Sequence, residues 1–170
     1  RQRQMCIRDS DSLNLTVLPG EVFGFLGPNG AGKTTTMRML VGLLRPTTGS
    51  ASIAGHDIER EPCRAKQATG YLPDTPYLYD KLTGREHLRF VGGLYHLDDG
   101  DVEGRMARLL ALVELEDRAG DLIETYSHGM RQRLALAAAL IHEPDVLLMD
   151  EPFSGLDPRS TLRVKEVLRT

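Results

Sequence analysis

A glycine-rich loop between two apolar segments limits the folds open to this chain more than any other stretch. Residues 27–34, "GPNGAGKT", fit the pattern G-x-x-x-x-G-K-[ST]. The mostly apolar residues 22–26 precede it, as expected of a strand buried in a parallel sheet. Four apolar residues then recur at helical spacing: Met37, Leu40, Val41 and Leu44. Strand, glycine loop and helix are the context this motif requires, so the sequence predicts an α/β fold with a phosphate site.

The residue types in the loop suit phosphate oxygens. Glycines let the backbone turn so that its N–H groups point inward at an anion. Lys33 is placed to reach the β- and γ-phosphates of a nucleotide and act in catalysis, and Thr34 to put its hydroxyl on Mg²⁺. The competing interpretation, a glycine-rich turn with an unrelated lysine, does not account for the flanking segments. The predicted nucleotide contacts are Gly27, Pro28, Asn29, Gly30, Ala31, Gly32, Lys33, Thr34 and Thr35.

Two carboxylates end a second apolar run. Residues 146–149 have the composition of a parallel strand, and Asp150 and Glu151 follow at once. The carboxyl ends of strands are where open α/β sheets bind ligands. We therefore expect Asp150 to act on Mg²⁺, directly or through water, and Glu151 to accept a proton from an attacking water. The alternative is a pair of solvated loop acids.

A third segment, "YSHGMRQRLALAAALIHEP" at 126–144, places a serine beside a histidine. Adjacent residues seldom point at each other, so Ser127 and His128 are poorly arranged as nucleophile and base. Helical spacing starts at Met130, and Pro144 ends it. Ser127 and Gly129 would then lie at a helix N-terminus, either as a simple cap or as a site for an anion.

Four segments in this order resemble the ATP-binding cassette of ABC transporters: "GPNGAGKTT", "YSHGMRQR", "LLMDEP" and "SGLDP". The resemblance runs from about Leu13 to the end of the chain. The Ser-x-Gly element at 127–129 is its most specific part, because it separates this family from other P-loop ATPases. The stretch 70–90 further resembles the cassettes of bacterial exporters for drugs or similar cargo.

The resemblance implies a P-loop NTPase fold with ATP and Mg²⁺ as cofactors. Its RecA-like core would comprise residues 11–74 and 143–170, with a small antiparallel edge sheet and a helical subdomain inserted at 75–142. Asp74 stands where the family usually has a glutamine that senses Mg²⁺ and the attacking water. We therefore expect Asp74 on the metal side with Thr34 and Asp150.

The resemblance also implies partners. Two cassettes would pair head to tail, so that Ser127 and Gly129 bind the γ-phosphate of the partner's ATP and Asp157 contacts the partner. His128 would be a variant residue of the motif and not a base. A transmembrane permease would hold the cassette at the cytoplasmic face of the membrane, where ATP-driven dimerisation and hydrolysis would power transport.

Local patterns predict several elements. Residues 50–54 read as a strand of the edge sheet, and Thr83 with Glu86 as a capping box. A second helix presents one apolar face: Val102, Met106, Leu109, Leu110 and Val113. Residues 1–10, "RQRQMCIRDS", have no period of either kind and are interpreted as a non-native leader.

Two family features fall outside this chain, which we interpret as truncated at both ends. The aromatic residue that stacks on adenine should lie upstream of Leu13, and the histidine that meets the γ-phosphate should lie past Thr170. We assign surface or packing roles to His56, His87, His96 and His142. The 170-residue chain alone is therefore expected to hydrolyse ATP weakly or not at all.

Composition and the spacing of the motifs limit the functions that remain possible for the chain. A net charge of −3 without a basic cluster disfavours nucleic acid as a partner. Two cysteines provide no disulfide framework. Lys33 and Ser127 lie too close in sequence for the long coiled coil of DNA-repair members of the family. A soluble tandem cassette acting on ribosomes and a cassette that binds ATP without hydrolysis remain as alternatives, the latter opposed by intact Lys33, Thr34, Asp150 and Glu151.

Overall fold

A computed structural model describes residues 13–28 and 30–151. The predictions for residues 1–10, Asn29, Asp157 and the helix expected from Pro158 lie outside these residues. The elements in chain order are α1 (Lys33–Leu40), β1 (Ser52–Ile53), β2 (His56–Asp57), α2 (Pro62–Gln67), β3 (Thr69–Leu72), α3 (Gly84–Leu94), α4 (Asp99–Leu112), α5 (His128–Leu140) and β4 (Val146–Met149), with short 3-10 turns at Glu116–Arg118 and Ile123–Thr125.

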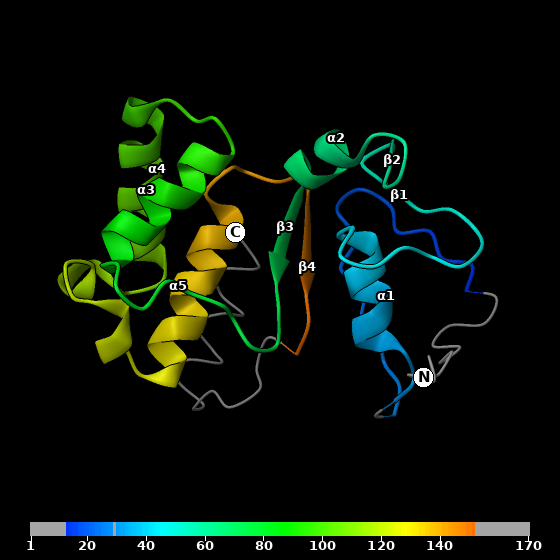
Figure 1. Cartoon of the computed structure of the whole chain (residues 1–170), viewed down its shortest axis with the longest axis horizontal. Coiled ribbons are helices and arrows are strands. Elements are labelled where there is room, and N and C mark those ends of the chain that lie inside the picture. The colour runs from blue at the N-terminus through cyan, green and yellow to red at the C-terminus, as the bar shows by residue number, and fades with distance from the viewer. Residues whose placement is uncertain (1–12, 29, 152–170) are drawn as a thin grey trace, which may run out of the picture.

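A parallel pair of strands, β3 and β4, stands at the centre of the molecule. Thr69 pairs with Val146 at one end and Leu72 with Met149 at the other. In Figure 1 the helices α3, α4 and α5 lie on one side of this sheet, and α1, α2, β1 and β2 lie on the other. The predicted strand at 146–149 is confirmed, and its parallel partner is β3.

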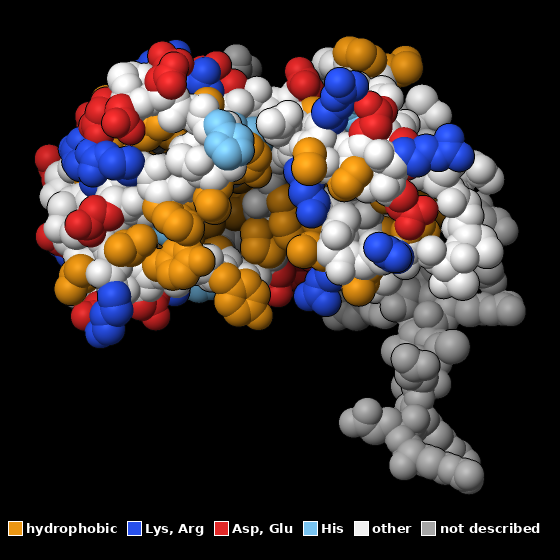
Figure 2. Space-filling model, turned by 45° about the horizontal axis from the view of Figure 1, so that its top comes forward, with side chains coloured by type: hydrophobic (Ala, Val, Ile, Leu, Met, Phe, Trp, Pro, Cys, Tyr) orange, Lys and Arg blue, Asp and Glu red, His pale blue; other side chains and the backbone are white. Residues whose placement is uncertain are grey.

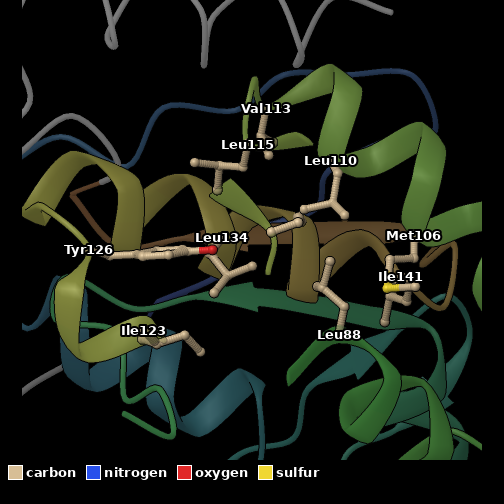
Figure 3. Packing of buried hydrophobic residues seen from close by; sticks show 11 residues of the cluster. Leu88, Met106, Leu110, Val113, Leu115, Ile123, Tyr126, Leu134 and Ile141 are labelled. Carbon is tan, nitrogen blue, oxygen red and sulfur yellow. The ribbon is translucent and has the colours of Figure 1, made fainter. Parts of the chain in front are cut away.

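The side of the sheet with α3, α4 and α5, which we call the helical side, has a core of buried apolar side chains. Its buried cluster joins α3, α4 and α5, and Figure 3 shows its side chains converging from these helices. Leu88, Met106 and Leu134 have no exposed surface. The predicted apolar face of the second helix is confirmed, with Val102, Met106, Leu110 and Val113 all buried and Leu109 partly buried.

The helix starts on this side follow the sequence signals. The Thr83 hydroxyl accepts a hydrogen bond from the Glu86 amide, and the Glu86 carboxylate accepts one from the Thr83 amide. The capping box is therefore confirmed, and it closes the first turn of α3.

On the face in Figure 2, acidic and basic side chains alternate over the helical side, and hydrophobic side chains line the hollow between the two sides.

The strand expected within 50–54 is confirmed in shorter form. Ser52 and Ile53 pair antiparallel with Asp57 and His56 in a two-stranded hairpin. Gly55 takes a φ of 83° in the turn between the strands, a backbone conformation that suits glycine.

Two local predictions are wrong. Residues 22–26 form no strand, and most of their large apolar side chains are exposed, with Val22 94% and Leu26 95% exposed. A buried strand needs ladder partners on a neighbouring strand, and hydrophobic composition alone does not supply them. The helix that follows ends at Leu40, so Leu44 lies beyond it, exposed.

Candidate nucleotide-binding site

The predicted phosphate loop and the predicted acids meet at one edge of the molecule. In Figure 1 the N-terminus of α1 lies at the same end as the carboxyl ends of β3 and β4. This is the edge where parallel sheets bind ligands. The positions follow from the chain, because the glycine loop leads directly into α1 and Asp150 follows β4 directly.

Hydrogen bonds from the loop's own lysine hold together the loop before α1. The Lys33 ammonium donates hydrogen bonds to the carbonyl oxygens of Gly27, at 2.8 Å, and Pro28, at 2.9 Å. Gly30 and Gly32 both adopt positive φ, 82° and 84°. Residues with a side chain rarely adopt this backbone conformation, which explains why glycine is needed at these two positions. The lysine charge is thereby held against the first residues of the loop.

The first turn of α1 is open to an anion. Its N-cap is Gly32, which has no side chain to occupy the free N–H groups of the turn. Those N–H groups, the helix dipole and the Lys33 charge all favour negative charge at this place. Thr34 and Thr35, in the same turn, are half-buried. The local structure therefore fits the phosphate groups of a nucleotide.

The register of the sheet brings the acids together. Leu72 is paired with Met149, and the Asp150 amide donates to the Leu72 carbonyl over 2.8 Å. Asp74 is thus two residues beyond β3 at the place where Asp150 and Glu151 follow β4. The Asp150 side chain is buried, at 5% exposure, and Asp74 and Glu151 are exposed. The arrangement gives a sheltered carboxylate beside two that solvent reaches.

Glu151 has an unusual backbone. Its φ of 48° lies in the left-handed region, which non-glycine residues seldom occupy. Strained residues of this kind persist where the surrounding structure holds them, and they cluster at functional sites.

Tyr71 belongs to the site but was missed by the sequence analysis. Burial raises the pKa of its phenol, and the negative charge of Asp150 raises it further. The positive charge of Arg38 in α1 acts on this pKa in the opposite direction. Tyr71 of β3 is therefore close enough to both Arg38 and Asp150 to feel their charges. No local pattern could have found it, because a tyrosine within an apolar strand reads as a core residue.

The helix start with Ser127 and Gly129 lies on the other side of the sheet from the phosphate loop. The Ser127 hydroxyl accepts a hydrogen bond from the Met130 amide at 3.3 Å, so the predicted N-cap of α5 is confirmed. In Figure 1 the sheet stands between α5 and α1. Ser127 and His128 are exposed. The fold thus separates the Ser-x-Gly element from the phosphate loop of the same chain and leaves it facing outward.

The histidines have packing and surface positions. The His142 ring stacks on Tyr95 with 3.7 Å between ring centroids, and its Nε2 lies 3.1 Å from the Thr69 carbonyl. His87 is buried in α3, and burial lowers its pKa. His56 approaches the Glu61 carboxylate at 3.6 Å, and His96 is exposed.

The family model described as "ABC transporter" matches residues 10–154, most of the chain. The chain belongs to the ABC transporter family. It is 43% identical over 157 residues to the linearmycin resistance ATP-binding protein LnrL of Bacillus subtilis, covering 92% of this chain and 50% of the relative. It is 44% identical over 160 residues to the daunorubicin resistance ATP-binding protein DrrA3 of Streptomyces coeruleorubidus, covering 94% of this chain and 51% of the relative.

Solved cassettes of the family share the fold. One described as an ATP-binding subunit of an ABC transporter is 37% identical, with a TM-score of 0.76 over 84% of this chain and 60% of the other. Another, a dimeric cassette in a post-hydrolysis state bound to ADP and phosphate, is 25% identical, with a TM-score of 0.85 over 95% of this chain and 73% of the other. The P-loop NTPase fold is confirmed. The chain spans about half the length of the curated relatives it matches.

The donor set fits a magnesium nucleotide. A threonine hydroxyl and a few carboxylates supply the oxygen ligands that Mg²⁺ prefers, and this ion usually keeps several of its waters. Among residues 13–28 and 30–151 no group of three or more His, Cys, Asp or Glu side chains could hold a metal ion by itself. In the same residues no helix is both long enough and apolar enough to traverse a lipid bilayer.

Proposed function

We propose that this chain is the nucleotide-binding part of an ATPase that powers transport through a partner membrane protein. The observation that carries the proposal is the register of β3 and β4, which puts Asp74, Asp150 and Glu151 at the edge where α1 begins. Family membership and the fold support the same conclusion.

The proposed chemistry divides among a few residues. The loop amides and the Lys33 ammonium bind the phosphates and stabilise charge on the transferred phosphoryl group. Thr34, Asp150 and Asp74 would hold Mg²⁺, which would neutralise negative charge on the phosphates when bound. Glu151 is exposed. It accepts a proton from a water that attacks the γ-phosphorus, while the bond from that phosphorus to the bridging oxygen breaks and ADP leaves.

A second cassette completes the site in this proposal. Ser127 is exposed and Gly129 is half-buried at the start of α5, on the far side of the sheet from their own phosphate loop. A helix N-terminus in that position can bind the γ-phosphate held by another copy. Asp157 would contact that copy, and one solved relative is itself a dimer.

The names of the relatives support a membrane partner. LnrL and DrrA3 are named as resistance ATP-binding proteins, which supports an exporter of drug-like cargo. We place the cassette at the cytoplasmic face of the membrane, held there by a permease. The buried Asp150 beside Glu151 argues against a cassette that binds ATP without hydrolysis, because both acids of the mechanism are present.

The substitution Glu151→Gln tests the proposal. In the longer protein that carries these residues, the substitution keeps the shape of the side chain and removes the base, so ATP should still bind while phosphate release falls by about 10²–10⁴-fold. The same variant should form a dimer with ATP that light scattering detects. Asp145→Asn, a change at an acid just before β4 and outside the site, is the matched control and should leave turnover unchanged. Normal turnover by Glu151→Gln would remove Glu151 from the mechanism.

A further inference from the structure

The two faces of the β3–β4 sheet pack against different helices, and Tyr71 lies on the face toward α1. Its neighbour Leu72 packs against α5. Because side chains alternate along a strand, Tyr71 lies on the opposite face, the side of the sheet where Figure 1 shows α1 and α2. Tyr71 is paired with Leu148 in the parallel register, and Leu148 packs on that same side, against the buried cluster around Ile53.

The helix α1 is seated on this face by its C-terminal end. Leu40, its last residue, packs against the same buried cluster as Leu148. Thr36, one turn earlier, is 8% exposed, so these two residues mark the buried side of the helix. The Arg38 carbonyl accepts a hydrogen bond from the Leu43 amide at 2.8 Å, which fixes the chain where the helix ends.

Arg38 and Tyr71 lie close together between α1 and β3. Burial raises the pKa of Tyr71 most, the charge of Asp150 raises it further, and the charge of Arg38 lowers it. Asp74 acts in the same direction as Asp150. The phenol oxygen is therefore near the guanidinium on one side and the acids of the candidate site on the other. A phenol can accept a hydrogen bond from a guanidinium and donate one to a carboxylate.

The spacing along α1 matches the spacing along the strands. The helix runs antiparallel to β3 and β4, because its N-terminus lies at their carboxyl ends. Arg38 and Thr34 share one face of α1 and are one turn apart, about 6 Å at about 1.5 Å per residue. Asp150 lies two residues beyond Leu148 on the same face of the sheet, about 7 Å at about 3.3 Å per residue. With Arg38 beside Tyr71, Thr34 is therefore level with Asp150.

We propose that Arg38 and Tyr71 are positioning residues for the candidate magnesium site. Their contact fixes the register of α1 on the sheet, and with it the separation between the Thr34 hydroxyl and the Asp150 carboxylate. The inference rests on the proposed function, in which these two groups are magnesium ligands. Arg38 and Tyr71 act through Thr34 and Asp150 and do not touch the ion themselves.

The polar pair supplies what apolar packing does not. The hydrophobic contact of Leu40 has no preferred direction, so it does not by itself fix how far α1 slides along the sheet. A hydrogen-bonding group acts over a narrow range of distance and angle, so a polar pair does fix it. Mg²⁺ requires near-ideal octahedral geometry with ligands at about 2.0–2.1 Å, so a small slide of α1 would weaken its binding.

Tyr71→Phe tests the inference, with Tyr79→Phe as the matched control. Both changes remove a hydroxyl and keep the ring, and Tyr79 lies outside the site, 57% exposed and in ring contact with Phe90. In the longer protein that carries these residues, the dissociation constant of a non-hydrolysable ATP analogue is measured with Mg²⁺ and with EDTA. The ratio of the two constants reports how much the metal ion strengthens binding, and it involves no turnover.

The ratio should fall about tenfold or more in Tyr71→Phe and in Arg38→Gln, because groups that orient metal ligands change metal affinity by about 10–100-fold. It should keep the parent value in Tyr79→Phe. The constant measured with EDTA should not change in any variant, since the phosphate loop keeps the hydrogen bonds of Lys33. Arg38 is exposed, so Arg38→Gln should still fold.

Two further variants separate positioning from a merely structural role. The double variant Tyr71→Phe, Arg38→Gln should lose no more than the worse of the two single variants, because both changes remove the same contact. Arg38→Lys, which keeps the positive charge, should recover part of the ratio. A lower melting temperature with an unchanged ratio would show a structural role alone and overturn the inference.

The remaining outcomes also decide the question. Additive losses in the double variant would overturn the inference, and so would an equal rise of the dissociation constant with Mg²⁺ and with EDTA, which indicates general damage to the loop. A parent that binds the analogue no better with Mg²⁺ than with EDTA would overturn the proposed function, and the inference with it. A parent that shows the metal effect, with variants that keep it in full, would overturn the inference alone. The two failures are therefore distinguishable.

Discussion

The stretch before α1 and the helical side differ in how far their apolar side chains are buried. Leu26 is 95% exposed and Val22 is 94% exposed, whereas Leu134 and Met106 have no exposed surface. Both segments look like core in the sequence. The helical side completes its packing within about 60 consecutive residues, from α3 to α5. Residues 22–26 instead depend on strand partners from distant parts of the chain.

The candidate site and the helical side are also built from different kinds of chemical group. The candidate site is built from backbone N–H groups, one lysine and carboxylates at strand ends, and most of these groups are open to solvent. The helical side is built from interlocking side chains. Damage to the first should therefore remove activity and leave stability, and damage to the second should do the reverse.

The largest expected effect comes from Lys33→Ala. Among the described residues, the ammonium donates hydrogen bonds to two carbonyls of its own loop, so its loss should change the free energy of unfolding little. Loss of its charge from the phosphates should lower kcat/KM for ATP by about 10²–10³-fold or more. Phosphate release and nucleotide titration on the protein that carries these residues measure both quantities. A kcat/KM equal to that of the parent would contradict the assignment of Lys33.

The next effect sharpens the comparison of the two apolar segments. Leu134→Ala empties a fully buried position and should lower the free energy of unfolding by about 2–5 kcal/mol. Leu26→Ala changes an exposed position and should stay within about 0.5 kcal/mol of the parent. Denaturant unfolding of both variants gives the comparison. If Leu26→Ala cost as much as Leu134→Ala, residues 22–26 would be buried in solution, as the sequence pattern predicts.

The smallest expected effect is a dependence of stability on pH. Burial lowers the pKa of His87 and of His142, and Arg105 lowers the latter further, although the Thr69 carbonyl acts in the other direction. A lowered pKa means that the unfolded chain binds a proton in the window between 6.5 and the folded value, where the folded chain does not. Stability should therefore fall as pH falls below 6.5 through that window.

The control for the pH measurement is the double variant His87→Phe, His142→Phe. Phenylalanine cannot titrate, so the slope of unfolding free energy against pH should become flatter just below pH 6.5 than in the parent. An unchanged slope would assign the acid sensitivity to other groups.

Some features followed from local sequence because local forces decide them. The capping box of α3 needs only Thr83 and Glu86, three residues apart, and the N-cap of α5 needs only Ser127 and the start of a helix. The apolar face of α4 follows from its 3.6-residue period. The strand at 146–149 also carried enough apolar residues to be found.

Other features depended on residues far apart in the chain. The sequence placed Asp150 and Glu151 after a strand but contained nothing to say that this strand pairs with Thr69–Leu72, or in which register. The stack of Tyr95 on His142 joins two distant segments and had no local signal. Tyr71 had none either.

The sequence by itself determined the phosphate loop, the helix starts and the pair of acids, because each rests on backbone preference and charge within a few residues. Only the tertiary structure decided which strand lies beside β4, that the Ser-x-Gly element faces away from its own phosphate loop, and that residues 22–26 stay exposed. The physical reason is that hydrogen-bond ladders and side-chain packing between distant segments form only when the whole chain is in place.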